Sequence, residues 1–283
     1  MRYGFNTFNH SVWLGLPPTL PAQIHAAAAA GYEHVGLDVP SLLAHEAAGL
    51  SPAAIADRMA EVGISPHELA FLSLSGEPAT SARDLDDVIR MVEALRPAQV
   101  QGVIMGEVDD RCVEFTTTVV AAVAEHGATV CVEYVAGWPV CSIAPVRELI
   151  ATVGRRELQV CVDTFHFFHG PDTWADLEGL PLAELGLVQF EDALPLADGT
   201  DLGTDAVVHG RALPGEGHLD LDGFARRVVG MGYDGVVSVE ACSGVWRDRP
   251  LDEFARASLA TTRAIWERAG SRVEGDEAHG GYG

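Results

Sequence analysis

The chain has 283 residues, 48% of them hydrophobic and 21% charged, and its 41 acidic side chains against 18 basic ones give a net charge of -23. All the basic side chains are arginines, and the absence of lysine excludes Schiff-base aldolase chemistry and covalent binding of pyridoxal phosphate. Because such a negative chain repels phosphate backbones and anionic membranes, we expect neither a nucleic-acid partner nor a membrane partner.

The chain shows no targeting or membrane signal. No charged and apolar leader opens it, and no apolar run reaches the roughly 18 residues of a membrane span, so we expect a cytoplasmic protein. Five cysteines without CxxC spacing are typical of reduced packing residues. We expect one domain over residues 1–270 and a disordered acidic, glycine-rich tail over 271–283.

Strand-like and helix-like segments alternate through the first half of the chain. Short apolar runs predict strands over 3–8, 34–38, 67–74 and 100–105. Helices are predicted through 24–30, 52–59, 81–95 and 112–125. An alanine run that stops at Gly31 and a capped start at Ser51 with Pro52 support the first two of these helices.

The second half repeats the alternation. Four strands are predicted to end at residues 133, 163, 189 and 240, and helices are predicted over 144–153, near Trp174, over 221–231 and over 252–268. Eight strand-then-helix units without a break in composition predict an α/β fold closed as a (β/α)8 TIM barrel. An open doubly wound sheet is the alternative, but no glycine-rich phosphate loop follows any strand.

Four polar side chains end the apolar runs of the second half. They are Glu133, Asp163, Gln189 and Glu240. In a barrel the carboxyl ends of the strands meet at the active site, so these oxygen donors would converge. Each taken singly reads as a solvated loop residue, but four unpaired groups so close together would repel one another without a cation. The pattern therefore predicts a site for one divalent metal ion.

Six segments resemble a known family, the xylose isomerase-like TIM barrels. They are GYEHVGLD at 31–38, VEYVAGW at 132–138, VDTFHFFHG at 162–170, VQFEDALP at 188–195, RALPGEGHLDL at 211–221 and GYDGVVSVE at 232–240. The family includes sugar phosphate isomerases and epimerases, inosose-processing enzymes, ketose 3-epimerases and 3-dehydroshikimate dehydratases. The resemblance extends to about Arg268 and implies metal ligation by Glu133, Asp163, Gln189 and Glu240.

Some positions depart from common family patterns, among them Asp38, which stands where the family commonly has a glutamate in the second strand. Many members place histidine where this chain has Gln189, and the glutamine form resembles a subgroup that includes the dehydroshikimate dehydratases. An amide oxygen in place of an imidazole favours Mg²⁺ or Mn²⁺, with Co²⁺ as a further candidate, and argues against zinc. The glutamate that ketose 3-epimerases carry six residues after the first ligand is Pro139 here, which argues against that group.

The resemblance also implies residues that face the substrate. His166 would be an acid/base or a hydrogen-bond donor, and its pKa class suits proton transfer near neutrality. His169 is either a specificity position or merely exposed. Arg211 could clamp substrate oxygens through its rigid fork, or it could hold its loop by a salt bridge to Glu216 or Asp192.

Three further side chains are candidate walls of the substrate site. His10 and Trp13 follow the first strand, and Trp138 follows the fifth. They could stack on a sugar face, although ordinary packing explains the two tryptophans equally well.

The function implied by the resemblance is a metal-dependent isomerase or epimerase of carbohydrate metabolism acting on a polyhydroxy carbonyl compound. Glu133 and Glu240 would move a proton beside the carbonyl through a metal-stabilised enediolate. The alternative is a dehydratase or lyase that uses the same site. The sequence Ala241-Cys242-Ser243-Gly244 lacks the FND-like continuation of dehydroshikimate dehydratases.

The fold class leaves two other classes of function as alternatives. Endonuclease IV shares this kind of barrel, but it needs a histidine-rich zinc site and a positive DNA surface, which this chain lacks. A barrel that binds a ligand without turnover is the second. Barrels of this family often form dimers, so a homodimer is also considered, although no segment of the sequence identifies an interface.

Overall fold

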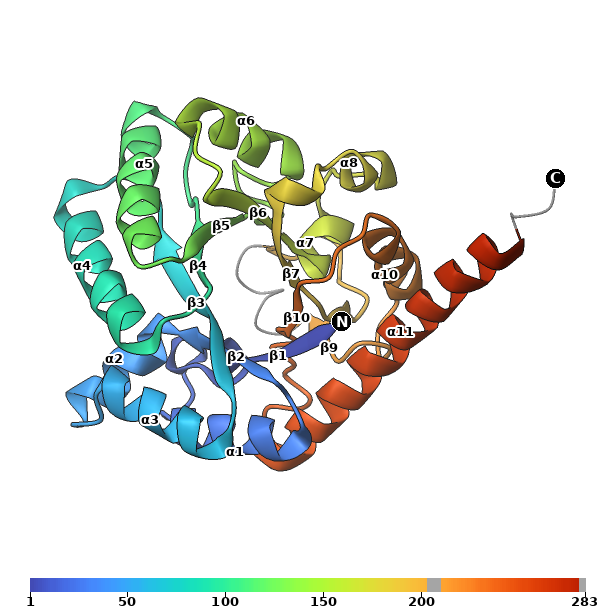
Figure 1. The fold of residues 1–283 in the computed structure, drawn as a ribbon, viewed down its shortest axis with the longest axis horizontal. Helices are drawn as coiled ribbons and strands as arrows, with labels where there is room; N and C mark the ends of the chain where they lie inside the picture. The colour runs from blue at the N-terminus through green and yellow to red at the C-terminus, as the bar shows by residue number, and fades with distance from the viewer. Residues whose placement is uncertain (203–209, 280–283) are drawn as a thin grey trace.

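The computed structural model describes the backbone of residues 1–202 and 210–279, and the side chains of these residues except 78–82 and 272–279. Parallel strands form a closed barrel in the order β1-β10-β7-β6-β5-β4-β3-β2 (Figure 1). Their bounds are Arg2–Asn6 for β1, His34–Asp38 for β2, Ser65–Ser73 for β3, Gln99–Val103 for β4, Thr129–Glu133 for β5, Leu158–Asp163 for β6, Leu185–Gln189 for β7 and Val236–Val239 for β10. The predicted TIM barrel is therefore confirmed, and because β1 pairs with β10 the open-sheet alternative is wrong.

Helices surround the barrel (Figure 1). In the described part of the chain they are η1 Thr7–His10, η2 Val12–Leu14, α1 Leu20–Ala30, α2 Val39–Ala47, α3 Pro52–Val62, α4 Pro78–Leu95, α5 Asp110–Glu125, α6 Ile143–Val153, α7 Thr164–His169, α8 Trp174–Glu178, η3 Leu182–Glu184, α10 Leu221–Gly230 and α11 Leu251–His279. The predicted caps are present: the Ser51 side chain accepts a hydrogen bond from Ala54 N–H, and Gly31 ends α1 in the left-handed conformation. None of these helices is long and apolar enough to cross a membrane.

Strand ends meet at one rim of the barrel because the strands are parallel and in register. Val103 pairs with Glu133, Asp163 pairs with Gln189, and Gln189 also pairs with Ser238. Below this rim the strands are almost continuously buried, as parallel strands covered by helices should be. The register therefore brings together side chains that are far apart in sequence.

A short antiparallel sheet extends the rim. Its strands are β8, Asp192–Ala193, and β9, Arg211–Ala212. The Asp192 carboxylate accepts backbone hydrogen bonds from Gly215 and Leu219, and a Cβ at Gly217 would lie only 2.3 Å from Asp192 Oδ1. This close approach requires glycine, and it holds the loop after Arg211 against β8.

Three predicted segments differ from the structure. β1 ends at Asn6, because the Asn6 side chain accepts from Phe8 N–H and starts η1. The helix α2 was not predicted; Asp38 caps it by accepting from Ser41 N–H. Residues 271–279, predicted to be disordered, continue α11, in keeping with the helix-forming Arg, Glu and Ala among them, and 280–283 lie outside the described residues.

Candidate active site

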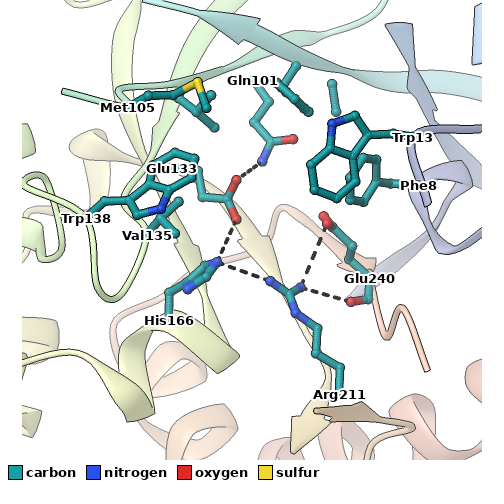
Figure 2. A pocket seen from close by; sticks show the side chains of 13 residues that line it. Phe8, Trp13, Gln101, Met105, Glu133, Val135, Trp138, His166, Arg211 and Glu240 are labelled. Atoms are coloured by element: carbon teal, nitrogen blue, oxygen red, sulfur yellow. Dashed lines mark hydrogen bonds and ion pairs between the residues drawn. The ribbon is translucent and has the colours of Figure 1, made fainter. Parts of the chain in front are cut away.

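A cavity of about 150 Å³ opens at the carboxyl ends of the strands (Figure 2). Its polar lining side chains are Gln101, Glu133, His166, Arg211 and Glu240. Its other lining residues are apolar or aromatic: Phe8, Trp13, Ala70, Phe71, Val103, Met105, Val135 and Trp138. The cavity therefore has a charged end, where Glu133 and Glu240 lie, and an apolar wall.

Glu133, Asp163 and His166 could hold a metal ion, because each offers a ligand atom and these atoms lie within 4.8 Å of one another. The local sequence explains the arrangement. Asp163 ends β6 and caps α7 by accepting from His166 N–H at 2.9 Å, which places the histidine one turn into the helix. Glu133 and Asp163 are predicted ligands, whereas His166 is expected only to face the substrate; the structure adds His166 to the candidate ligands.

Gln189 and Glu240 are the other two predicted ligands, and both are buried in the same cluster. Gln189 Nε2 donates to Glu240 Oε2. Gln101 Nε2 links the pair to Glu133, because it donates to Glu133 Oε2 at 2.6 Å and lies 3.3 Å from Gln189 Oε1. The structure thus brings together all four predicted side chains.

Arg211 crosses the middle of the cluster and is 2% exposed. Its Nη1 lies 3.1 Å from Asp163 Oδ2, 3.5 Å from Glu191 Oε1 and 3.8 Å from Glu240 Oε1. The predicted alternative of a salt bridge to Glu216 or Asp192 is wrong, because the guanidinium points into the barrel rather than along its own loop.

The carboxyl groups carry strongly perturbed pKa values. Burial and the neighbouring Asp163 raise the pKa of Glu133 to about 8. Burial and Glu133 raise the pKa of Glu240 well above its usual value. Burial also acts to raise the pKa of Asp163, but Arg211 and His166 bring it below the usual range. Asp163 is therefore the group that stays ionised most easily.

Burial also changes what His166 can do, since it lowers the pKa of the imidazole to about 4. Ala136 N–H points at Nδ1 of this ring at 3.2 Å. The Nε2 atom lies 3.6 Å from Glu133 Oε1 and 3.1 Å from Arg211 Nη2. The expectation of a pKa near neutrality is wrong, because burial disfavours the charged ring.

The remaining predicted site residues divide into two groups. Trp13 and Trp138 line the cavity. His10 does not line it; its ring packs 4.9 Å from that of Phe254 in the interior. His169 also lies outside the lining, stacked on Phe165 with Nδ1 2.8 Å from the Phe165 carbonyl oxygen.

Sequence reasoning missed several polar side chains around the cluster. Gln101 lies on β4, Asn6 ends β1, Glu68 lies on β3, and Glu191 follows β7. Asn6 Nδ2 donates to Glu68 Oε1 and, at 3.0 Å, to Glu240 Oε2. A signal for Gln101 and Glu68 existed: each is a polar residue within a buried strand that needs a partner there.

The donor set fits a divalent cation. Five carboxyl groups lie in the same cluster as the Arg211 guanidinium: Glu133, Asp163, Glu191 and Glu240 around it, and Glu68, which Asn6 connects to Glu240. Glu68 Oε2 and Glu191 Oε2 are buried without a hydrogen-bond partner. Oxygen donors with a shortfall of positive charge match hard divalent ions, and one imidazole is compatible with a transition metal.

Comparison with known proteins identifies the family of the chain. A family model described as xylose isomerase-like TIM barrel matches residues 24–265. The chain belongs to this family. The inosose isomerase of Halalkalibacterium halodurans is 25% identical over 165 residues, which are 56% of this chain and 56% of that protein. The 3-dehydroshikimate dehydratase of Pseudomonas putida is 25% identical over 273 residues, 92% of this chain but only 42% of that protein.

Solved structures share the fold of this family member. A fusion protein of a xylose isomerase-like TIM barrel and 4-hydroxyphenylpyruvate dioxygenase superposes with a TM-score of 0.82 at 23% identity, over 98% of this chain and 44% of that one. The zinc-bound IOLI protein has a TM-score of 0.81 at 17% identity, over 95% and 99% of the two chains. A D-psicose 3-epimerase crystallised with D-fructose has a TM-score of 0.70 at 20% identity, over 94% and 99%.

Proposed function

We propose that the protein is a divalent-metal-dependent isomerase or epimerase that moves a proton beside the carbonyl of a small polyhydroxy ketone. The observation that carries the proposal is one cavity in which two buried carboxyl groups, Glu133 and Glu240, lie with Arg211 between them (Figure 2). The names of the inosose isomerase and the D-psicose 3-epimerase support this class of reaction.

The metal would be held by Glu133, Asp163, Gln189 and Glu240, with His166 as a further candidate. A divalent ion bound there would supply a Lewis acid that polarises the substrate carbonyl. The mixed oxygen donors favour Mg²⁺ or Mn²⁺, with Co²⁺ as the alternative.

The protein side chains have distinct roles in this proposal. Glu133, which lines the cavity, can take a proton from one carbon of the substrate and return it to that carbon or to its neighbour. Glu240 can likewise take and return a proton, from the opposite side of the bound substrate. His166, whose ring is kept neutral by burial, helps to position the substrate rather than donating a proton to it.

The test combines metal content with solvent exchange. The purified protein is expected to bind near-stoichiometric divalent metal and to carry deuterium from heavy water into keto-sugars or inososes beside the carbonyl. Glu240→Gln should lose both properties. Absence of metal and of exchange after metals are added back would overturn the proposal.

A dehydratase is the second candidate, favoured by Gln189 and by the alignment with 3-dehydroshikimate dehydratase over 92% of this chain. Loss of a β-hydroxyl from the same deprotonated substrate would give an enone or an aromatic product. Ultraviolet absorbance distinguishes the two reactions, because water loss increases it and epimerisation does not.

A further inference from the structure

We propose that His34 and His67 form a second metal site, at the end of the barrel opposite to the candidate active site, and that it binds an imidazole-preferring divalent ion such as Cu²⁺, Ni²⁺ or Zn²⁺. His34 begins β2 and His67 lies near the start of β3, whereas the candidate active site lies where the strands end. The two sites share no residue, so this inference does not depend on the proposed function.

A β-bulge in β3 brings the two histidines together. The register of β2 on β3 shifts after Val35, because the next residue of β2 pairs with Glu68 rather than with His67. His67 is therefore an extra residue on β3, and such bulges commonly change the direction of a side chain. The His34 and His67 rings lie 5.5 Å apart between centroids, with their planes inclined by 48°.

The separation of the two rings matches that of two ligands of one metal ion. Imidazole nitrogen binds a metal at about 2.0–2.1 Å, so two such ligands at angles of about 110–120° have ring centroids about 5.2–5.5 Å apart. The observed separation of 5.5 Å falls at the end of this range. One ion can therefore contact both rings without a change in the backbone of either strand.

Both rings offer a nitrogen to such an ion. His67 Nε2 is buried without a hydrogen-bond partner, although buried polar atoms are nearly always paired. His34 Nδ1 lies 3.0 Å from Ser65 Oγ, which leaves Nε2 of that ring for a ligand. Burial lowers the pKa of His67 to about 4 and also lowers that of His34, so both imidazoles are neutral and can ligate a metal near neutral pH.

The surroundings of the pair decide which ion it takes. Besides burial, the Arg2 guanidinium lowers the pKa of both rings, and Glu33 acts to raise that of His34. A pair of imidazoles near an arginine suits Cu²⁺, Ni²⁺ or Zn²⁺ and is a poor site for Mg²⁺ or Mn²⁺. The candidate active site differs, because His166 is the single imidazole among its candidate ligands.

Electron paramagnetic resonance of bound Cu²⁺ tests the inference on the full-length protein in excess Mg²⁺. We expect a copper signal coupled to two nitrogens. His34→Asn and His67→Asn should each weaken Cu²⁺ binding by about tenfold or more and remove the coupling to one nitrogen. His25→Asn, on the exposed face of α1, is the matched control and should change neither property. Unchanged copper binding in both His34→Asn and His67→Asn would overturn the inference.

Glu240→Gln separates this site from the candidate active site. The variant should keep the copper signal coupled to two nitrogens, because it alters only the other end of the barrel. Loss of that signal in Glu240→Gln, with no loss in the histidine variants, would assign the copper to the active site and overturn the inference. If no ketone exchanges deuterium, the proposed function fails while the copper measurement stands.

Arg2→Gln tests the local charge without removing a ligand. Because the guanidinium of this exposed residue repels a cation, the variant should bind Cu²⁺ about threefold more tightly or better. The same groups could instead attract an anion, so binding of inorganic phosphate is measured beside that of Cu²⁺. Phosphate binding that is lost in Arg2→Gln, His34→Asn and His67→Asn, together with no copper coupled to two nitrogens, would identify an anion site and overturn the inference.

Discussion

The two halves of the barrel contribute different chemistry to one cavity. The half from β5 to β10 supplies most of the charged groups, with Glu133, Asp163 and Glu240 around Arg211, while Glu68 on β3 is the one carboxyl group of the cluster named above that comes from the other half. The half from β1 to β4 lines the cavity mostly with aromatic and aliphatic side chains and with one amide, Gln101, and Trp138 after β5 adds to this apolar wall. The charged half can polarise and deprotonate a substrate, and the other half excludes water and restricts shape, so neither half makes a site alone.

The largest expected effect comes from removing a carboxylate of the charged half. Glu133→Gln should lower the exchange rate by about 10²- to 10⁴-fold, the contribution of a positioned acid/base group. The loss is measured as the rate of deuterium exchange, and the metal content of the variant is measured beside it. Glu125→Gln, which makes the same change on the exposed end of α5, should retain full exchange; an active Glu133→Gln would remove the acid/base role.

Removing the cation of the charged half should cost stability. Arg211→Met leaves buried carboxyl groups without their partner and should lower the free energy of unfolding by about 3–5 kcal/mol, measured by urea denaturation in chelator. Added divalent metal should restore part of the loss. Arg156→Met removes an exposed ion pair with Glu157 and should change stability by less than about 1 kcal/mol; equal losses in both variants would contradict a buried charge network.

The two halves should also respond oppositely to pH. Burial lowers the pKa of His10, in the β1–β4 half, to about 4, so the unfolded chain binds a proton that the folded chain refuses between pH 6.5 and 4. The contribution of His10 to the free energy of unfolding is therefore complete above pH 6.5, and it decreases by at most about 3 kcal/mol as the pH falls to 4. Glu133 acts in the other direction, because its raised pKa costs stability as pH rises from 4.5 through about 8.

His10→Phe tests this sign. The variant should be more stable than the original protein at pH 4.5 relative to pH 7.5, measured as the shift of the urea midpoint between the two values. His25→Phe changes an exposed histidine of α1 and serves as the control. If the urea midpoints of His10→Phe and of the original protein changed equally between the two pH values, the pKa of His10 would be the same in the folded and the unfolded chain.

The difference between the halves also decides what could be predicted from the sequence. Strand-end carboxylates such as Glu133 and Glu240 are visible because an acid that ends an apolar run has no packing role. The partners of Arg211 were not visible, because β9 reaches the cluster only through the folded sheet with β8. Nor was the lowered pKa of His166, which depends on burial by residues distant in sequence.

The β1–β4 half was harder to predict for a related reason. Trp13 lines the cavity and His10 lies in the core, although the two are only three residues apart. A sequence does not distinguish an aromatic residue that packs in the core from one that binds a ligand. Gln101 and Glu68 offered a signal as polar residues inside apolar strands, but the groups they would contact were set by the barrel register.

Gln101 joins the two halves and gives the smallest of the expected effects. Its Nε2 donates to Glu133 Oε2, and this hydrogen bond lowers the pKa of Glu133 against the effect of burial. Gln101→Leu should therefore lower exchange by about 10- to 100-fold, the usual effect of losing a group that orients a metal ligand. It should also move the pH at which exchange begins upward, because Glu133 would hold its proton more tightly. Gln99→Leu is the matched control, since Gln99 lies on the same strand but donates to the Gly186 carbonyl instead. If both variants lowered exchange equally without a pH shift, Gln101 would support the barrel rather than orient Glu133.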